Sequence, residues 1–253
     1  MTDTHPRVIL ITGATSGIGA GTAKKFAEEG WHLVLTGRRA DRLEEAGETL
    51  GVPVHTICAD VTDLAAMTEA LSSLPAPFDA VEVLVNNAGH GIGSDAKFQE
   101  ADLEQLHAMV EANIGGVLTC TRLLLPGMIE RRRGHVINLG SIFHRYPYPM
   151  SHVYNSTKAF VENFTQGLRA DLLGTDVKVS TIEPGLVLTE FVERRFHGDQ
   201  ELIKKRLGDA DGLLPEDIAE CIWFCVNTPR RMTVSRLEAV MTDQAPAPNL
   251  VIN

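Results

Sequence analysis

The sequence predicts an α/β fold of a single domain, built on a doubly wound parallel sheet of about seven strands flanked by helices. Short β-branched runs alternate six times with longer amphipathic stretches, and glycines stand at the joins between them. Such alternation favours parallel strands joined by right-handed crossovers. The sequence has no repeat, low-complexity tract or Pro/Ser-rich linker, which indicates one domain over residues 1–253.

Short apolar runs mark the expected strands. These are Val8–Thr12, His32–Thr36, Val54–Cys58, Val83–Asn86, His135–Leu139 and Lys178–Ile182, with a weaker one at Arg236–Val240. Stretches with apolar residues at helical spacing separate them. The expected helices are Gly17–Glu29, Asp41–Leu50, Asp63–Leu74, Asp102–Glu130, Val153–Leu173 and Pro215–Asn227. The charged stretch Thr189–Leu213 shows neither pattern strongly, which favours a mobile substrate lid around residues 187–213.

Composition and charge exclude several classes of protein. With 44% hydrophobic and 22% charged residues, the chain is typical of globular proteins and unlike disordered or collagen-like ones. A net charge of -10 opposes binding to phosphate backbones and anionic lipid, so we expect no nucleic-acid or membrane partner. The apolar runs are broken before they reach the roughly 20 residues of a membrane helix.

The N-terminus and the cysteines bear on the compartment and on metals. Residues 1–7 lead into the first expected strand without the apolar stretch of a secretory signal, which favours a cytoplasmic protein. Cys58 and Cys120 are isolated, and only Cys221 and Cys225 lie close together, in an apolar segment. We therefore expect buried thiols and no metal site.

A glycine-rich turn, Thr-Gly-Ala-Thr-Ser-Gly-Ile-Gly over residues 12–19, joins the first strand to the first helix. Such a turn lets the backbone approach a pyrophosphate, whose charge then rests on the helix N-terminus. Gly13, Gly17 and Gly19 therefore indicate dinucleotide binding. Their spacing differs from the usual G-x-G-x-x-G, and a tight strand-to-helix turn is the alternative.

Arg38 and Arg39 follow the second strand, about twenty residues after this turn, where an acidic side chain would bind the ribose 2′-hydroxyl of NAD. Guanidinium groups suit a 2′-phosphate instead, because they present a planar fork of donors to an oxyanion. We therefore expect NADP(H), with Arg38 the stronger candidate. In the alternative, both arginines cap secondary structure in solvent.

Polar residues also follow the third strand, at Asp60–Val61, and the fourth, at Asn86–Gly89. Open α/β sheets bind ligands at these strand ends, so we expect contacts to adenine and adenosine. Alternatively, Asp60 caps the next helix and the asparagines close a turn.

Tyr154 and Lys158 stand at positions i and i+4 of an expected helix and share one face, and Ser141 ends the fifth strand. A neighbouring ammonium favours the phenolate, which brings the phenol proton within reach of transfer near neutral pH. Ser141 can donate to the same substrate oxygen as negative charge develops there. The pattern indicates a general acid for a carbonyl, although in isolation such a pair is an ordinary surface contact.

Taken in order, these motifs resemble those of the single-domain short-chain dehydrogenases/reductases over nearly the whole chain. The matching residues are Thr12-Gly-x3-Gly-x-Gly19, Asn86–Gly89, Asn113, Ser141, Tyr154-x3-Lys158 and Pro184–Gly185. The resemblance implies a Rossmann fold, a homotetramer and a catalytic tetrad of Asn113, Ser141, Tyr154 and Lys158. It implies that Tyr154 protonates the substrate, Lys158 lowers the pKa of Tyr154 and holds the nicotinamide ribose, and Asn113 orders a water relay.

The resemblance also implies a set of cofactor contacts from the glycine turn, the strand ends and the lid. They are Gly13, Thr15, Ser16, Gly17, Ile18, Gly19, Arg38, Arg39, Asp60, Val61, Asn87, Ala88, Gly89, Tyr154, Lys158, Pro184, Gly185, Val187 and Thr189.

Within this family, Trp31–Arg42, Leu124–Gly127, Tyr146–Phe160 and Arg169–Gly185 resemble the NADP-dependent 3-hydroxy acid (serine) dehydrogenases. The resemblance implies a small anionic substrate, since that group also reduces malonic semialdehyde and a related branch reduces sulfoacetaldehyde to isethionate.

The loop between Ser141 and Tyr154 should border the substrate pocket because both of its ends are catalytic. The expected substrate contacts are Ser141, His144, Arg145, Tyr148 and, from the lid, Arg195. The 3-hydroxy acid dehydrogenases carry small residues in place of His144 and Arg145, which favours a larger oxyanion such as a sulfonate. In the alternative, Arg145 points into solvent.

We therefore expect NADPH-dependent reduction of a small anionic aldehyde, sulfoacetaldehyde to isethionate. The alternative is an NADP-dependent 3-hydroxy acid/serine dehydrogenase that acts on malonic semialdehyde. A broad reductase of neutral carbonyl compounds and an NADP-binding sensor without turnover are weaker alternatives.

Overall fold

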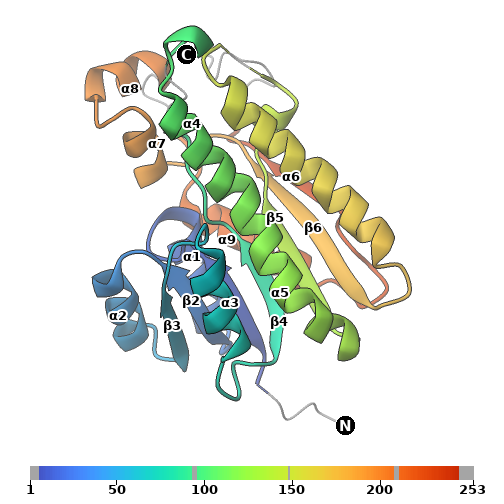
Figure 1. Ribbon diagram of the computed structural model, residues 1–253. Coiled ribbons are helices and arrows are strands. Elements are labelled where there is room, and N and C mark those ends of the chain that lie inside the picture. The colour runs from blue at the N-terminus through green and yellow to red at the C-terminus, as the bar shows by residue number, and fades with distance from the viewer. Residues whose placement is uncertain (1–5, 93–95, 148, 208–210, 245–253) are drawn as a thin grey trace.

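The computed structural model describes residues 6–92, 96–147, 149–207 and 211–244. Over these residues the chain forms a seven-stranded sheet with helices on both faces (Figure 1). The strands are β1 (Val8–Thr12), β2 (His32–Gly37), β3 (Val54–Cys58), β4 (Val81–Asn86), β5 (Gly134–Leu139), β6 (Val177–Pro184) and β7 (Arg236–Ala239). Their order is β3-β2-β1-β4-β5-β6-β7, and every neighbouring pair is parallel. The predicted fold class is confirmed.

Two layers of helices bury the sheet. The first layer is α1 (Gly17–Glu28), α2 (Ala40–Thr49) and α9 (Pro215–Val226), and the second is α3 (Leu64–Ser72), α5 (Gly116–Glu130) and α6 (His152–Asp171). Phe26 of α1 and Ile222 of α9 belong to the first core cluster, and Met67 of α3 and Cys120 of α5 to the second. Every residue of β1 is buried, as expected of a strand covered on both faces.

The long helix expected at Asp102–Glu130 is interrupted. The structure has α4 at Leu103–Val110, one π-helical turn at Glu111–Gly115, and then α5. A π-helical turn inserts an extra residue into the helix, which a periodicity of 3.6 cannot reveal. Such turns are frequent at functional sites, and this one contains Asn113.

The expected lid contains two short helices, α7 (Glu190–Arg195) and α8 (Gln200–Leu207). The sequence showed no helical pattern for α7 because six residues are too few to display one. Its first turn depends instead on Thr189, whose hydroxyl accepts a hydrogen bond from the amide of Phe191 at 3.3 Å.

By length and composition alone, Leu103–Glu130 could cross a membrane, with a hydropathy of 1.2 over its best window. Within the described residues, however, Cys120, Leu124 and Met128 of this segment pack in the core beneath the sheet. Part of the apolar composition of this segment therefore serves to cover the core.

Core packing around β4 predicts a measurable stability difference. Leu84 is fully buried in β4, so Leu84→Ala should lower the free energy of unfolding by about 2–5 kcal/mol through lost burial and the cavity left behind. The matched control is Leu64→Ala at the start of α3, where the side chain is 62% exposed and the loss should be slight. Urea unfolding measures both, and equal losses would contradict this account of the core.

Candidate active site

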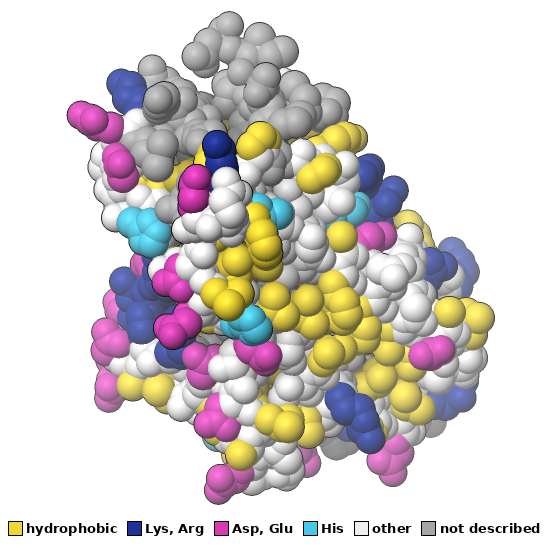
Figure 2. All heavy atoms as spheres, turned by 45° about the horizontal axis from the view of Figure 1, so that its top comes forward, with side chains coloured by type: hydrophobic (Ala, Val, Ile, Leu, Met, Phe, Trp, Pro, Cys, Tyr) yellow, Lys and Arg dark blue, Asp and Glu magenta, His cyan; other side chains and the backbone are white. Residues whose placement is uncertain are grey.

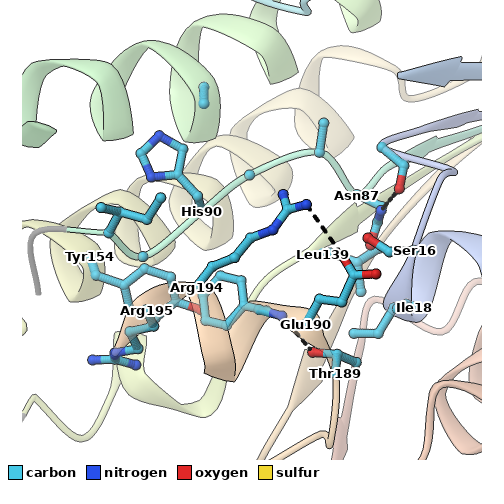
Figure 3. A pocket seen from close by; sticks show the side chains of 18 of the residues that line it. Ser16, Ile18, Asn87, His90, Leu139, Tyr154, Thr189, Glu190, Arg194 and Arg195 are labelled. Atoms are coloured by element: carbon cyan, nitrogen blue, oxygen red, sulfur yellow. Dashed lines mark hydrogen bonds and ion pairs between the residues drawn. The ribbon is translucent and has the colours of Figure 1, made fainter. Parts of the chain in front are cut away.

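A cavity of about 1140 Å³ lies at the carboxyl ends of the strands (Figure 3). Strand order reverses between β1 and β4, and open α/β sheets bind ligands beside such a reversal. The predicted site residues that line the cavity are Gly13, Thr15, Ser16, Gly17, Ile18, Arg38, Arg39, Asp60, Val61, Asn87, Ala88, Gly89, Ser141, Tyr154, Lys158, Pro184, Gly185, Val187, Thr189 and Arg195. Gly19, Asn113, His144 and Arg145 are not among the lining residues, and Tyr148 lies outside the described residues.

Backbone geometry explains the glycines of the turn between β1 and α1. Gly13 and Gly17 have φ angles of 66° and 53°, which favour glycine. A Cβ on Gly19 would stand 2.4 Å from the backbone oxygen of Gly13, so the turn can close only with glycine there. Ser16, the N-cap of α1, makes no side-chain capping hydrogen bond. The start of this helix is therefore suited to a phosphate.

Asn87 fixes this turn from the neighbouring strand. Its side-chain amide donates to the backbone oxygens of Thr12 and Gly13 at 2.8 and 3.1 Å. The Thr12 hydroxyl in turn accepts from the amides of Asn87 and Ala88, both at 3.0 Å. Asn86 instead donates within the core to Thr121 and Asn138. Asn87 therefore shapes the cavity that it lines.

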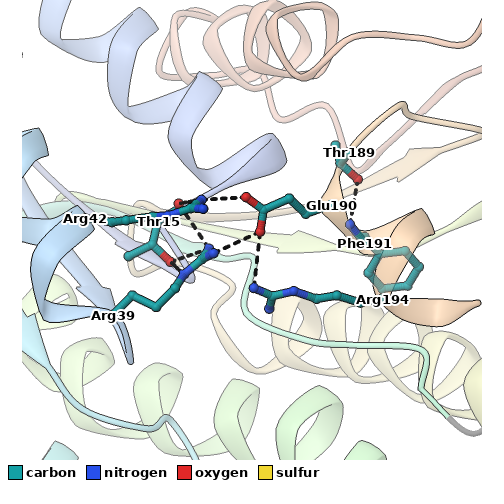
Figure 4. A network of polar contacts seen from close by, with 7 residues as sticks. All are labelled: Thr15, Arg39, Arg42, Thr189, Glu190, Phe191 and Arg194. Atoms are coloured by element: carbon teal, nitrogen blue, oxygen red, sulfur yellow. Dashed lines mark hydrogen bonds and ion pairs between the residues drawn. The ribbon is translucent and has the colours of Figure 1, made fainter. Parts of the chain in front are cut away.

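Arginines gather where a 2′-phosphate is expected (Figure 4). Arg39 donates to the hydroxyl of Thr15 at 2.9 Å and to the carboxylate of Glu190 at 2.9 Å. Glu190 also binds Arg42 and Arg194. These contacts, from Arg42 above all, hold the pKa of the Glu190 carboxyl below its ordinary value. Three guanidinium groups around one carboxylate leave positive charge in excess, and the cavity therefore fits NADP(H).

Arg38 and Asp60 form a more exposed pair beside this cluster, with an Nη1–Oδ2 distance of 3.2 Å. The Arg38 side chain is 68% exposed, whereas that of Arg39 is 25% exposed. Arg39 is thus the better ordered of the two arginines. The sequence analysis did not include Arg42 in the phosphate site. Its position three residues after Arg39, at the start of α2, could have indicated that the two side chains lie on the same side of the helix.

Tyr154 and Lys158 occupy one face of α6, and both are buried. The Lys158 ammonium donates to the backbone oxygen of Leu139 at 2.7 Å and lies 5.9 Å from the centre of the Tyr154 ring. Burial raises the pKa of Tyr154 to about 12, although its hydrogen bond with Ser141 lowers the pKa in part. Burial also lowers the pKa of Lys158 to about 8.

These pKa values differ from the expectation that Lys158 would lower the pKa of the phenol. Desolvation of Tyr154 outweighs its hydrogen bond with Ser141, and the Lys158 ammonium is directed at a backbone carbonyl instead of the phenol. The phenol is therefore protonated at neutral pH. A protonated, buried phenol beside Ser141 is a proton donor for a substrate oxygen.

Asn113 joins the strand-end loop to α6. Its Oδ1 accepts from the amide of His90 at 2.9 Å, and its Nδ2 donates to Thr157 Oγ1 at 3.0 Å. The Thr157 hydroxyl donates to the backbone oxygen of Tyr154 at 2.8 Å. Asn113 therefore supports the helical turn that carries the phenol, and its expected water relay stays a prediction.

The structure does not bring His144 and Arg145 into the cavity, which corrects the expectation that they contact substrate. Arg145 binds Glu183 at 3.0 Å and Glu238 at 3.3 Å. His144 Nδ1 lies 2.7 Å from the backbone oxygen of Ser141. The physical reason is Glu183, whose fully buried carboxyl group accepts a hydrogen bond from Arg145 and so holds that side chain away from the cavity.

The lid places an arginine and a phenylalanine beside the Tyr154 ring; Figure 3 shows Arg195 next to Tyr154. The guanidinium of Arg195 lies 5.3 Å from the centre of the Tyr154 ring, and the ring of Phe191 lies 5.7 Å from it. Arg195 is buried, and its Nη2 donates to the hydroxyl of Ser151. Sequence reasoning missed Phe191, since one aromatic residue in a charged stretch carries no distinct signal.

Known proteins share this arrangement. A family model described as short chain dehydrogenase matches residues 7–200. Sulfoacetaldehyde reductase 2 of Chromohalobacter salexigens is 44% identical over 241 residues, which cover 94% of this chain and 95% of that protein. The NADP-dependent 3-hydroxy acid dehydrogenase YdfG of Salmonella typhi is 42% identical over 239 residues, 94% of this chain and 96% of that protein.

A solved structure described as the closed form of serine dehydrogenase complexed with NADP+ has a TM-score of 0.89 and 39% identity to this chain. The match covers 94% of this chain and 96% of the other. Together with the family match and the two relatives, it confirms the resemblance that the motifs indicated. The chain belongs to the short-chain dehydrogenase family.

Proposed function

We propose that this chain uses NADPH to reduce a small anionic aldehyde, sulfoacetaldehyde, to its alcohol, isethionate. The chain is an NADP-dependent oxidoreductase acting on an alcohol or aldehyde, and its cofactor is NADP(H). One observation carries the substrate class: the buried guanidinium of Arg195 lies 5.3 Å from the centre of the Tyr154 ring. A carbonyl oxygen at the phenol would place an attached anionic group within reach of that cation.

NADPH, when bound, supplies a hydride to the carbonyl carbon. Tyr154 donates its proton to the carbonyl oxygen, for which its raised pKa keeps it protonated. Ser141, hydrogen-bonded to Tyr154, donates to the same oxygen as negative charge develops there. The Lys158 ammonium would hold the nicotinamide ribose and favour the developing charge, and solvent would return a proton to Tyr154.

A buried guanidinium suits the sulfonate or carboxylate of a small substrate, because a charge-assisted hydrogen bond strengthens when water is excluded. Arg195 and Phe191, both of α7, line the cavity beside the Tyr154 ring, and Ser151 holds the guanidinium from behind the lining. The close spacing of Arg195 and Tyr154 favours a substrate of two or three carbons over a longer one.

The choice of sulfonate over carboxylate rests on the name of one relative, sulfoacetaldehyde reductase 2, at 44% identity. The earlier reason, a larger oxyanion held by His144 and Arg145, falls away because neither lines the cavity. A second candidate is therefore oxidation of a 3-hydroxy acid such as serine, or reduction of malonic semialdehyde. The relative named 3-hydroxy acid dehydrogenase, at 42% identity, favours it.

We further propose a cytoplasmic homotetramer. Figure 2 shows hydrophobic side chains gathered in a band on one face of the molecule. Among the described residues, Val110 of α4 and Leu118 and Ile129 of α5 are large apolar side chains exposed to solvent. An apolar face of this kind supports contact with further copies of the chain.

A screen of NADPH oxidation tests the substrate. Sulfoacetaldehyde, malonic semialdehyde and propionaldehyde are compared at equal concentration, and kcat/KM should be highest for sulfoacetaldehyde. A preference for malonic semialdehyde would establish the second candidate. A preference for the neutral aldehyde would contradict the anionic substrate class.

Arg195 should determine the preference for anions. Arg195→Gln removes a charged hydrogen bond worth about 1.5–3 kcal/mol, so KM for sulfoacetaldehyde should rise by about 10- to 100-fold. KM for propionaldehyde should hardly change. The matched control is Arg194→Gln in the same helix, whose side chain pairs with Glu190 instead. Equal effects of Arg195→Gln on charged and neutral aldehydes would remove Arg195 from the substrate site.

Replacing Arg38 and Arg39 together by alanine should weaken NADPH binding by about 1–3 kcal/mol, through loss of charged hydrogen bonds to the 2′-phosphate. NADH, which lacks that phosphate, should bind as before. Fluorescence titration with both cofactors measures the difference. Arg132→Ala serves as control, because it removes an exposed ion pair with Asp176 and Arg132 does not line the cavity. Similar losses for NADPH and NADH would refute the phosphate assignment.

Lys158 predicts the pH dependence of reduction. Burial lowers its pKa to about 8, so the ammonium is present below that pH and is lost above it. The kcat for reduction should therefore be constant near neutral pH and fall as pH rises through about 8. Tyr154 stays protonated over this range because its pKa is about 12. Lys158→Arg, which remains charged, should be slower but lack this decline; the same decline in both proteins would assign it to another group.

A further inference from the structure

We propose that His144, Arg145 and Glu183 are positioning residues that act through Ser141. They form a hydrogen-bonded chain from a buried carboxylate on β6 to the backbone of the serine. The inference deepens the proposed function, because it rests on the role given there to the Ser141 hydroxyl. It assigns a task to side chains that the substrate cavity does not use.

The hydrogen bonds have a defined direction. Arg145 Nε donates to His144 Nε2 at 3.3 Å, so this ring nitrogen is an acceptor. In a neutral imidazole the other nitrogen, Nδ1, then carries the proton. His144 Nδ1 lies 2.7 Å from the backbone oxygen of Ser141 and donates to it. The arginine thus selects the histidine tautomer that can hold the serine.

Glu183 anchors the other end of the chain. It is fully buried at the end of β6, and its Oε2 accepts from Arg145 Nη2 at 3.0 Å. A buried carboxylate is costly unless it is paired, so Arg145 is held tightly in this place. A Cβ on Gly140, the residue before Ser141, would stand only 3.2 Å from Glu183 Cγ. The carboxylate therefore also packs directly against the strand end that carries the serine.

Further charged groups face Glu183 from the elements packed around it. Arg236 Nε of β7 lies 3.9 Å away, Glu238 of β7 binds the same guanidinium of Arg145, and Glu162 approaches from α6. Burial, followed by the charge of Glu162, raises the pKa of Glu183 to about 8. Arg236 and Arg145 oppose this rise, and the hydrogen bond that Arg145 donates to Oε2 holds this end of the chain in place.

The hydroxyl of Ser141 depends on the backbone that this chain holds. Ser141 is the N-cap of a 3-10 turn at Ile142–His144, and its Oγ accepts from the amide of Phe143 at 3.3 Å. The same hydroxyl is hydrogen-bonded to Tyr154. A shift of the peptide at Ser141 would move this hydroxyl relative to the phenol. Misplacement of a reacting group by 1 Å can cost about 100-fold in rate.

A double-mutant cycle on kcat for aldehyde reduction tests the inference. In the otherwise unchanged protein, His144→Ala should lower kcat by about tenfold, which is less than the cost of a full 1 Å misplacement. KM for NADPH should stay unchanged. In a Ser141→Ala background, His144→Ala should cause no further loss, since the hydroxyl that it positions is gone. His144→Asn, whose amide can donate in place of Nδ1, should restore part of kcat, and Arg145→Gln should lower it.

Glu82→Leu provides the matched control. Glu82 is a half-buried carboxylate that binds two arginines, Arg7 and Arg133, as Glu183 binds Arg145 and Arg236. Glu82→Leu should leave kcat unchanged, whereas Glu183→Leu, which removes the acceptor for Arg145, should lower it. Thermal unfolding and NADPH titration accompany every variant, so that a destabilised protein is distinguished from a mispositioned one.

The outcomes separate the two proposals. If Ser141→Ala loses activity and His144→Ala lowers kcat by the same factor in both backgrounds, His144 does not act through Ser141 and the inference is overturned. A loss equal in His144→Ala and His144→Asn, or no loss in either, also overturns it. If Ser141→Ala keeps full activity, the catalytic role of Ser141 in the proposed function is refuted first, and the positioning chain fails with it.

Discussion

Parallel strand direction is the constraint on which the rest of this structure depends. Helices connect each strand to the next one along the chain, so all seven strands of the described sheet end at the same edge. Gly13, Asn87, Ser141 and Gly185 follow four different strands, yet they line one cavity. The tight approach of Gly19 to the backbone of Gly13 then fixes the turn at the centre of that edge. The site is thus a consequence of topology and of one contact that only glycine permits.

Burial is the common cause of the unusual pKa values of Tyr154 and Lys158. The same desolvation raises the pKa of Tyr154 and lowers that of Lys158, because it disfavours the charged form of each. The outcome is a neutral phenol beside a lysine that titrates only slightly above neutral pH. This arrangement suits donation of a proton, and therefore reduction; oxidation of an alcohol would first require the phenol to lose its proton.

Local patterns predicted the parts of the site that lie close together in sequence. The glycine turn at residues 12–19 and the pair Tyr154 and Lys158 could be identified because their geometry follows from one turn or one helix face. The strands were predicted to within a few residues, since burial on both faces leaves nearly continuous apolar runs. These runs and their alternation with helices were sufficient to predict the fold class.

Contacts between distant segments account for what the sequence did not reveal. Arg145 was assigned to substrate because its loop is bounded by catalytic residues, but its partner Glu183 is 38 residues away and buried in the sheet. The clustering of Arg39, Arg42 and Glu190 likewise joins residues up to 151 positions apart. In each case the arginine could be recognised in the sequence, but the carboxylate that binds it could not be identified from sequence spacing. Side-chain electrostatics here is decided by tertiary packing.

The lid shows what those distant contacts achieve. α7 is too short to be stable alone, and at its first residue Glu190 binds Arg39 and Arg42 beside the expected phosphate site. At its last residue Arg195 approaches Tyr154, with Phe191 packed on the same ring. One short helix therefore spans from the cofactor end of the cavity to the substrate end. Because Glu190 is held to Arg39 by an ion pair, a phosphate bound at Arg39 would compete with that pair and so act on the helix that carries Arg195.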